Sequence, residues 1–264
     1  MKSKNGKGLA GLGMAVNKAF KRHRALRILV LCIPPIIIKI FSKAHQALLR
    51  KALPALPEEF AALPFAQHGL FKLVNDYDFD SVLDVGAGAG HHSNLLAKNG
   101  KAVTSLDFGA SIYAKSLDSI NEGVTRVEAN FYEVEFDEKF DCLWASHVLE
   151  HQPDPGQFLR RCMDLTREGG IIAITVPPLD HEVCGGHLTA WNAGLVLYQM
   201  VFNGIDCSRA SICSLGYNTT VIVYNDKRPR VDLAWDNGDI RLLKQYFPEF
   251  VTEPFDGHIN QWNW

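Results

Sequence analysis

The chain has 264 residues, of which 47% are hydrophobic and 21% are charged. This composition excludes a disordered protein, and the length suffices for one α/β core with additions. Six cysteines are scattered without a Cys-x-x-Cys pair, so we expect reduced thiols, no disulfide framework and no structural zinc.

The net charge of −2 hides an uneven distribution. Residues 2–51 hold 12 basic and no acidic residues, which leaves 15 basic against 29 acidic residues elsewhere, a balance of −14. An apolar run at 28–38 lies among these basic residues, but it contains two prolines and is shorter than the roughly 20 residues of a membrane-spanning helix. We therefore expect residues 1–57 to form a basic, apolar N-terminal extension.

Two interpretations of this extension stay open. Residues 1–50 could bind the anionic surface of the inner membrane from the cytoplasm, or they could pack as helices on the rest of the protein. A secretory signal is not favoured, because no small-x-small cleavage site follows the apolar run. A nucleic-acid-binding arm is not favoured either, since the acidic remainder would repel phosphates.

Residues 82–93, with the sequence VLDVGAGAGHHS, read as a buried strand, a glycine turn and the start of a helix. Gly86, Gly88 and Gly90 let the backbone bend tightly and approach a ligand, and the helix start offers unpaired N–H groups. A dinucleotide fingerprint requires its third glycine at 91, where this chain has His91.

The charges around this turn favour a cationic ligand. No Lys or Arg lies in residues 82–97, and Asp84 precedes the first glycine by two residues. A second strand at 102–106 ends at Asp107, which is placed to bind a ribose diol. A ribose, a positive centre and no phosphate together describe S-adenosylmethionine.

At this point the chain resembles the class I S-adenosylmethionine-dependent methyltransferases. The resemblance continues in order over residues 80–178, through the segments LDF (106–108), ANF (129–131), FDCLWASHVLEH (140–151) and LTREGG (165–170). It implies a doubly wound, seven-stranded, mostly parallel α/β sheet in a domain that spans residues 58–264.

The same resemblance implies which residues bind S-adenosylmethionine. The glycine turn and Asp84 would shape the methionine end of the site, Asp107 would hold the ribose, and Asn130 and Phe131 would border the adenine. Asn130 stands where the family often has an acid, although its carbonyl oxygen can accept the same hydrogen bond. The full set of expected cofactor-binding residues is Asp84, Gly86, Gly88, Gly90, Asp107, Phe108, Asn130, Phe131 and Ser146.

Turn signals and periodicity predict the remaining elements. Pro177 and Pro178 should end the fifth strand, and residues 179–192 should form a loop over the site. Residues 216–218 should form a turn between two late strands. The expected helices are 58–75 and 193–203, and the expected strands are 81–85, 102–106, 171–176, 211–215 and 219–224.

His147 follows the fourth strand and is our candidate general base for a hydroxyl acceptor. The segment 147–151 also matches His-x-x-Glu-His, a zinc-protease pattern, but a strand before it and prolines after it leave little helix to present two ligands. In the ubiquinone-pathway O-methyltransferases, two acids and a histidine at positions 147, 150 and 151 are associated with magnesium. A histidine replaces the first acid here, so we expect no metal site and interpret Glu150 and His151 as a structural pair.

The predicted loop at 179–192 combines titratable and aromatic residues. Trp191 could stack on a sugar while His181, Glu182 and His187 bond its hydroxyls, which makes both histidines candidate catalytic residues. The alternative is a lid that only excludes water. This region is similar to that of bacterial methyltransferases found with capsule and lipopolysaccharide synthesis.

These observations together predict a cytoplasmic methyltransferase that acts on a sugar or phosphosugar unit of a surface glycan. If residues 1–50 bind the membrane, the enzyme would lie on the inner membrane surface. The alternative acceptor is a quinone or another lipid-soluble small molecule. A membrane-bound module that binds the cofactor without catalysis is a third hypothesis.

Overall fold

The computed structural model describes residue 44 and residues 47–48, 50–110, 121, 123–179, 184–236, 238–251 and 263–264. Contacts group the chain into two units, Met1–Ala52 and Leu53–Trp264. Most of the first unit, including the apolar run at 28–38, lies outside the described residues. The predicted domain boundary after residue 57 stays a prediction.

The described part of the second unit contains a seven-stranded sheet in the order β3-β2-β1-β4-β5-β7-β6. The first five strands are parallel, and β7 runs antiparallel to both β5 and β6. This confirms the predicted fold class. The strands are β1 (Ser81–Val85), β2 (Ala102–Asp107), β3 (Val124–Glu128), β4 (Phe140–Ser146), β5 (Thr166–Val176), β6 (Ser211–Leu215) and β7 (Asn218–Tyr224).

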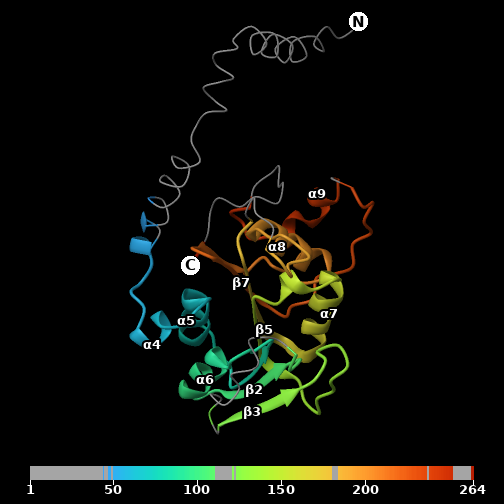
Figure 1. Ribbon diagram of the computed structural model, residues 1–264. Coiled ribbons are helices and arrows are strands. Elements are labelled where there is room, and N and C mark those ends of the chain that lie inside the picture. Colours follow the sequence, from blue (N-terminus) through green and yellow to red (C-terminus); the bar gives the residue numbers. More distant parts are fainter. Residues whose placement is uncertain are drawn as a thin grey trace, which may run out of the picture. The chain divides into compact units, whose positions relative to one another are not determined.

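Helices cover both faces of this sheet (Figure 1). On one face, α5 and α6 bury leucines against Val82, Val103 and Trp144. On the other face, α7 and α8 pack against Leu83, Val85 and neighbouring strand residues. The helical elements are α4 (Glu58–Ala61), α5 (Gln67–Asp76), α6 (His91–Lys98), η2 (Leu149–His151), α7 (Pro155–Leu165), α8 (Ala193–Phe202), α9 (Asp239–Leu243) and η3 (Lys244–Tyr246).

Local chemistry explains where the two helices of the second face begin. Asp154 precedes α7, and its Oδ1 accepts a hydrogen bond from Gln157 N at 2.9 Å, while Pro155 occupies the first turn. Asn192 caps α8 in the same way through Leu195 N at 2.8 Å. The helix predicted at 193–203 is therefore confirmed, and α8 ends one residue earlier.

The single helix predicted at 58–75 is wrong. The chain forms α4, breaks at residues 62–66, and resumes as α5. Pro64 lies in the break, and Ala66 has a φ of 54°, a left-handed conformation that interrupts helical hydrogen bonding. The break places Phe65 near the end of the sheet where the glycine turn lies.

Three strand boundaries also differ from the prediction. β2 ends one residue later, at Asp107. β5 begins at Thr166 instead of 171, because its first residue pairs with Phe140 before a register shift in the ladder. β7 begins at Asn218, which pairs with Leu215, so the turn consists of Gly216 and Tyr217 alone. Gly216 has a φ of 61°, as tight hairpin turns require.

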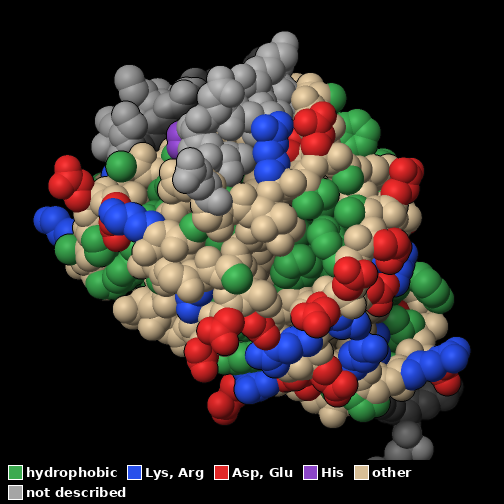
Figure 2. All heavy atoms as spheres, turned by 90° about the horizontal axis from the view of Figure 1, so that it is seen from below, with side chains coloured by type: hydrophobic (Ala, Val, Ile, Leu, Met, Phe, Trp, Pro, Cys, Tyr) green, Lys and Arg blue, Asp and Glu red, His purple; other side chains and the backbone are tan. Residues whose placement is uncertain are grey.

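The surface of the domain seen from below in Figure 2 mixes charges of both signs. Asp and Glu side chains are interspersed there with Lys and Arg side chains. Among the described residues, no helix combines the length and the apolar character needed to cross a bilayer.

We expect Asn225→Ala to destabilise the domain by about 1–3 kcal/mol. The buried Asn225 amide donates to the carbonyl oxygens of Met163 at 3.0 Å, Thr166 at 2.8 Å and Arg167 at 3.1 Å, and so joins the end of β7 to the α7–β5 junction. Urea unfolding measures the change. Asn75→Ala, at an exposed amide on α5, is the control and should change little; an equally small effect at Asn225 would contradict the prediction.

Candidate active site

The glycine turn lies between the carboxyl ends of β1 and β2. Gly86 N and Ala87 N both donate to Leu106 O, at 2.8 and 3.2 Å. Gly86, Gly88 and Gly90 have φ values of 69°, 52° and 75°, which other residues adopt only with strain. A Cβ on Gly86 would also lie 2.5 Å from Val148 Cγ2, so both conformation and space require glycine there.

Asp107 anchors this turn from the end of β2. Its Oδ2 accepts from Gly88 N at 2.9 Å, and its Oδ1 accepts from Gly109 N at 3.0 Å. The carboxylate is partly exposed and each oxygen keeps a second lone pair. Asp107 is thus placed at the turn, where the sequence predicts the ribose.

Asp84 is buried on β1, with 1% of its surface exposed. Ser93 Oγ donates to its Oδ2 at 2.6 Å and links the strand to α6. Burial raises the pKa of this carboxyl from 3.8 to about 7, against the opposing effect of the Ser93 hydrogen bond. A cation beside Asp84 would favour its ionised form, which fits the predicted sulfonium ligand.

The expected adenine residues occupy different environments. Asn130 Oδ1 accepts from Tyr132 N at 3.1 Å and shapes the turn after β3. Phe131 is buried and packs on Phe158 with ring centroids 5.0 Å apart, whereas Phe108 is exposed. Phe131 therefore contributes to the core, and Phe108 is free to cover a ligand.

Ser146 stands at the end of β4, beside the switch point between β1 and β4. Its hydroxyl is buried and has no hydrogen-bond partner. Because buried polar groups are almost always paired, this hydroxyl is available to a ligand. Crevices at such a switch point are where doubly wound sheets bind their ligands.

His147 follows Ser146 with a φ of 58°, a left-handed conformation that costs about 1–3 kcal/mol and is typical of functional sites. Its Nε2 lies 3.0 Å from Asn218 Oδ1, and its Nδ1 lies 3.3 Å from Glu150 Oε1. Ala66 N donates to the same Asn218 oxygen, which identifies it as the carbonyl end of the amide. His147 Nε2 therefore carries a proton in this arrangement.

Two partly exposed aromatic rings lie against His147. Phe65 is tilted with its centroid 4.8 Å from the imidazole, and Tyr217 is stacked on it at 5.6 Å and 5°. Phe65 is 41% exposed and Tyr217 is 47% exposed. We refer to Phe65, His147 and Tyr217 as the aromatic cluster.

His92 holds Phe65 in this cluster. Burial lowers the pKa of His92 to about 4, so the ring is neutral. Its Nδ1 accepts from Trp144 Nε1 at 3.1 Å, and its Nε2 donates to Phe65 O at 3.1 Å. Sequence analysis missed Phe65 and Asn218, and the only signal for Phe65 was Pro64, which predicts a break in a helix.

The predicted pair of Glu150 and His151 lies at η2, directly after β4. Glu150 is fully buried, and neither carboxylate oxygen has a hydrogen-bond partner. His187 joins this pair from the loop after β5, and the ligand atoms of the three side chains lie within 4.8 Å of one another. These three residues are the candidate metal ligands of the described chain.

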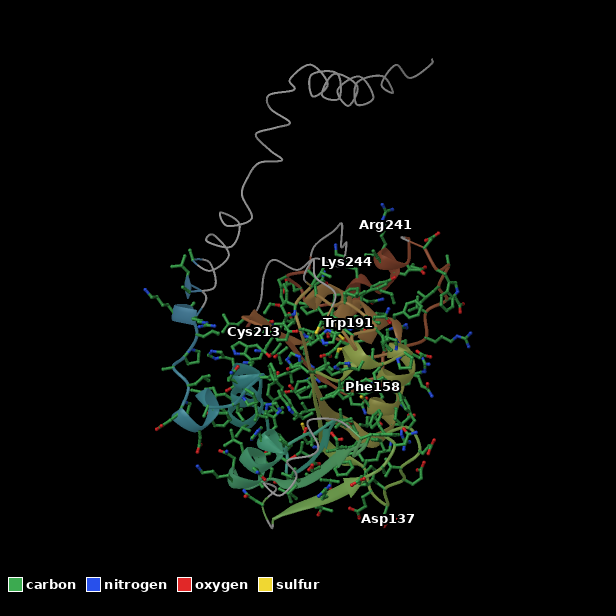
Figure 3. All side chains as sticks on the ribbon, in the orientation of Figure 1. Asp137, Phe158, Trp191, Cys213, Arg241 and Lys244 are labelled. Carbon is green, nitrogen blue, oxygen red and sulfur yellow. The ribbon has the colours of Figure 1, made fainter. Side chains whose placement is uncertain are left out.

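The predicted sugar-binding loop is only partly as expected. His181 and Glu182 lie outside the described residues, and His187 lies beside His151. Trp191 is 3% exposed, belongs to the core, and donates from Nε1 to Thr189 Oγ1 at 2.7 Å. Trp191 and Phe158, both labelled in Figure 3, belong to the same buried hydrophobic cluster. The prediction that Trp191 stacks on a sugar is therefore wrong.

A family model described as a methyltransferase domain matches residues 83–174. The ubiquinone biosynthesis O-methyltransferases of Pseudomonas fluorescens (strain Pf0-1) and Pseudomonas entomophila (strain L48) are each 35% identical over 94 residues. This match covers 34% of the chain and only 40% of each relative. The chain carries a class I S-adenosylmethionine-dependent methyltransferase domain.

Solved structures agree with this fold. A chain of the Haloferax volcanii complex between the Trm112 methyltransferase activator and a methyltransferase matches with a TM-score of 0.53 and 15% identity, over 63% of this chain and 90% of that chain. The Burkholderia thailandensis 1,6-didemethyltoxoflavin-N1-methyltransferase, solved with bound 1,6-didemethyltoxoflavin and S-adenosylhomocysteine, matches with a TM-score of 0.50 and 20% identity, over 60% and 76% of the two chains. At these identities the methyltransferase fold is the shared feature.

We expect Asp84→Asn to stabilise the cofactor-free methyltransferase domain more at about pH 8 than at about pH 5. The folded-state pKa of Asp84, about 7, lies above its ordinary 3.8. The fold therefore retains this proton longer than the unfolded chain, and stability falls as the pH rises between these two values. Above pH 7 the full cost of the buried charge remains, and the amide removes it.

Thermal melts of both proteins at the two pH values measure this difference. Asparagine retains an oxygen that can accept from Ser93, so the local geometry is preserved. Equal shifts in melting temperature at both pH values would contradict the raised pKa of Asp84.

Proposed function

We propose that the protein transfers the methyl group of S-adenosylmethionine to a hydroxyl of a flat, lipid-soluble ring compound of the quinone-precursor class. The observation that carries this proposal is the aromatic cluster at the end of β4, where two partly exposed rings flank His147. Aromatic side chains offer apolar faces on which a planar acceptor can stack.

The comparisons support this acceptor over the predicted glycan unit. The curated relatives that match the domain are named ubiquinone biosynthesis O-methyltransferases. The sugar hypothesis used Trp191 as its stacking residue, and Trp191 is buried in the core. The quinone-type acceptor, which the sequence analysis held as its alternative, is therefore our main proposal.

The binding residues in this proposal come from the predicted set, with the exposed Phe108 in place of the core residue Phe131 at the adenine. The glycine turn, Asp84 and Ser146 hold the methionine end of the cofactor, and Asp107 holds the ribose. Asn130 and Phe108 border the adenine. When bound, the cofactor supplies an electrophilic methyl group on a sulfonium, and the chain's own residues position the acceptor and exclude water.

His147 is the proposed general base, with Glu150 orienting its ring. To receive the acceptor's proton, Nε2 has to release Asn218 Oδ1 and the ring has to change tautomer, giving the Nε2 proton to solvent and taking up a proton from solvent at Nδ1. The Nδ1–H group then faces Glu150 Oε1 and keeps the ring in the tautomer that leaves Nε2 free. His147 Nε2 would then take the hydroxyl proton of the acceptor as the acceptor oxygen receives the methyl group that bound S-adenosylmethionine supplies.

We expect His147→Ala to lower kcat with a phenolic acceptor by about 10²–10⁴-fold, because general base catalysis contributes that much. The Kd of S-adenosylmethionine should change little. Phe65→Leu should mainly raise the KM of the acceptor, since the leucine side chain removes a stacking face and no titratable group. Steady-state kinetics and calorimetry separate these effects.

Paired assays with a prenylated catechol and a nucleotide sugar test the acceptor class. Asn75→Ala, at an exposed position on α5, is the control variant and should keep the kcat and KM of the unaltered chain. Turnover of the sugar and none of the catechol would overturn the proposal, and unchanged kcat in His147→Ala would remove the base from it.

We also propose that residues 1–50 bring the enzyme to an anionic membrane surface, where a lipid-soluble acceptor is concentrated. The support is the charge of this segment, in which basic residues surround the apolar run at 28–38 without any acid. Each Lys or Arg near an anionic bilayer contributes about 1 kcal/mol.

Replacing five basic residues of this segment by Gln should weaken binding to vesicles of phosphatidylglycerol by about 10³–10⁴-fold at low salt. The control variant removes the same number of exposed charges from the catalytic part and should bind like the unaltered chain. Equal binding of both variants in a vesicle flotation assay would contradict the proposal. The first set is Lys18, Lys21, Arg22, Arg24 and Arg27; the control set is Lys139, Lys227, Arg230, Arg241 and Lys244.

A further inference from the structure

Glu150 is an unusual residue for its position. The side chain is fully buried, and neither Oε1 nor Oε2 has a hydrogen-bond partner. The nearest imidazole nitrogens are His147 Nδ1 at 3.3 Å and His151 Nε2 at 4.0 Å, both measured to Oε1. A buried carboxylate without partners costs free energy, so a native fold retains one where a ligand compensates for it.

His151 is oriented as metal-binding histidines are. Its Nδ1 lies 2.7 Å from Gly186 O, so Nδ1–H donates to the carbonyl and the lone pair resides on Nε2. Nε2 is the nitrogen that faces Glu150. The 4.0 Å separation is too long for a hydrogen bond, but it suits two atoms that share an ion.

His187 completes the group from a segment far away in the sequence. The rings of His151 and His187 meet edge to face with centroids 4.9 Å apart. The loop that carries His187 is attached to η2, because Leu188 N and Thr189 N donate to Glu150 O at 2.8 and 3.2 Å. The position of His187 therefore depends on backbone hydrogen bonds to the residue that supplies the carboxylate.

We propose that Glu150, His151 and His187 form a binding site for one divalent transition-metal ion of the zinc class. One carboxylate oxygen and two imidazole nitrogens make a His₂Glu set, which leaves an open coordination position. The three ligand atoms lie within 4.8 Å of one another. Metal–ligand bonds of about 2.0–2.2 Å bring ligand atoms to about 3.5 Å apart in a tetrahedral site, so small side-chain rotations suffice.

The donor set distinguishes this ion from magnesium. Magnesium requires oxygen ligands in octahedral geometry, whereas imidazole suits zinc and its neighbours in the transition series. The pattern associated with magnesium has acids at 147 and 150, and this chain has a histidine at 147 and a further histidine at 187. These residues therefore do not fit magnesium. In place of the predicted absence of a metal site, we propose a site with two nitrogen ligands.

The contact between Glu150 Oε1 and His147 Nδ1, which the proposed general base uses, does not by itself explain the buried carboxylate. It leaves Oε2 without a partner and gives the Nε2 lone pair of His151 no role. A metal ion bound to Glu150 would compensate for the buried carboxylate and would bind the Nε2 lone pair of His151. The inference does not depend on the proposed acceptor, because metal binding is measured without turnover.

The test uses the full, untagged chain, stripped of metal and dialysed against equimolar zinc, manganese and magnesium. We expect one equivalent of zinc per chain by mass spectrometry and little magnesium. Cobalt in place of zinc should give the visible absorption of a low-coordinate site. Zinc should raise the melting temperature, because an ion that binds only the folded chain stabilises it.

Three variants identify the ligands. Glu150→Gln, His151→Ala and His187→Ala should each weaken zinc binding by at least about tenfold and abolish the cobalt spectrum. His91→Ala, at an exposed histidine outside the group, should bind zinc like the unaltered chain. Binding of S-adenosylhomocysteine, measured separately, shows whether each variant retains the cofactor site.

Glu150→Gln also tests the fold. Because an amide of the same shape replaces an unpartnered carboxylate, the metal-free variant should melt at or above the temperature of the metal-free parent. No zinc in the parent, a preference for magnesium, or unchanged zinc binding in His187→Ala would each overturn the proposal. Loss of turnover with intact metal binding would instead count against the proposed function alone.

Discussion

The hydrogen bonds between the glycine turn and the end of β2 are the constraint on which the rest of the site depends. Leu106 O and the Asp107 carboxylate receive three successive N–H groups from residues 86–88. These bonds hold the backbone in left-handed conformations that only glycine adopts without strain. The glycine turn also sets where α6 begins. His92, in the first turn of α6, forms hydrogen bonds with Trp144 and Phe65. One local geometry therefore connects the proposed cofactor pocket to the aromatic cluster.

Two buried carboxylates give the site its chemical character. Asp84 on β1 and Glu150 just after β4 are both removed from water near the carboxyl ends of adjacent strands. Neither has a lysine or arginine partner among the described residues. Groups of this kind reduce the stability of the empty protein and are characteristic of sites that bind cations. In our proposals Asp84 favours the cationic cofactor, and Glu150 holds a metal ion.

Some site residues lie inside the segment that matches the methyltransferase family model, and others lie outside it. Asp84 belongs to the segment 83–174 that matches the methyltransferase family model. His187, Asn218 and Tyr217 lie beyond that segment, and Phe65 precedes it. Substrate selection in this chain is therefore proposed to depend on segments outside the matched core. Loops and termini around a rigid sheet commonly carry such differences.

The amino-acid sequence determined the parts of the protein that depend on neighbouring residues. The strand and glycine turn at 82–90, Asp107 at the end of β2 and the sheet class follow from short-range patterns, since backbone sterics and periodicity act within a few residues. Only the tertiary structure decided which distant residues meet. It placed Phe65 against His147, brought His187 to Glu150, and buried Trp191 in the core. These contacts depend on how helices and loops pack over the sheet, and side-chain identity alone does not specify that packing.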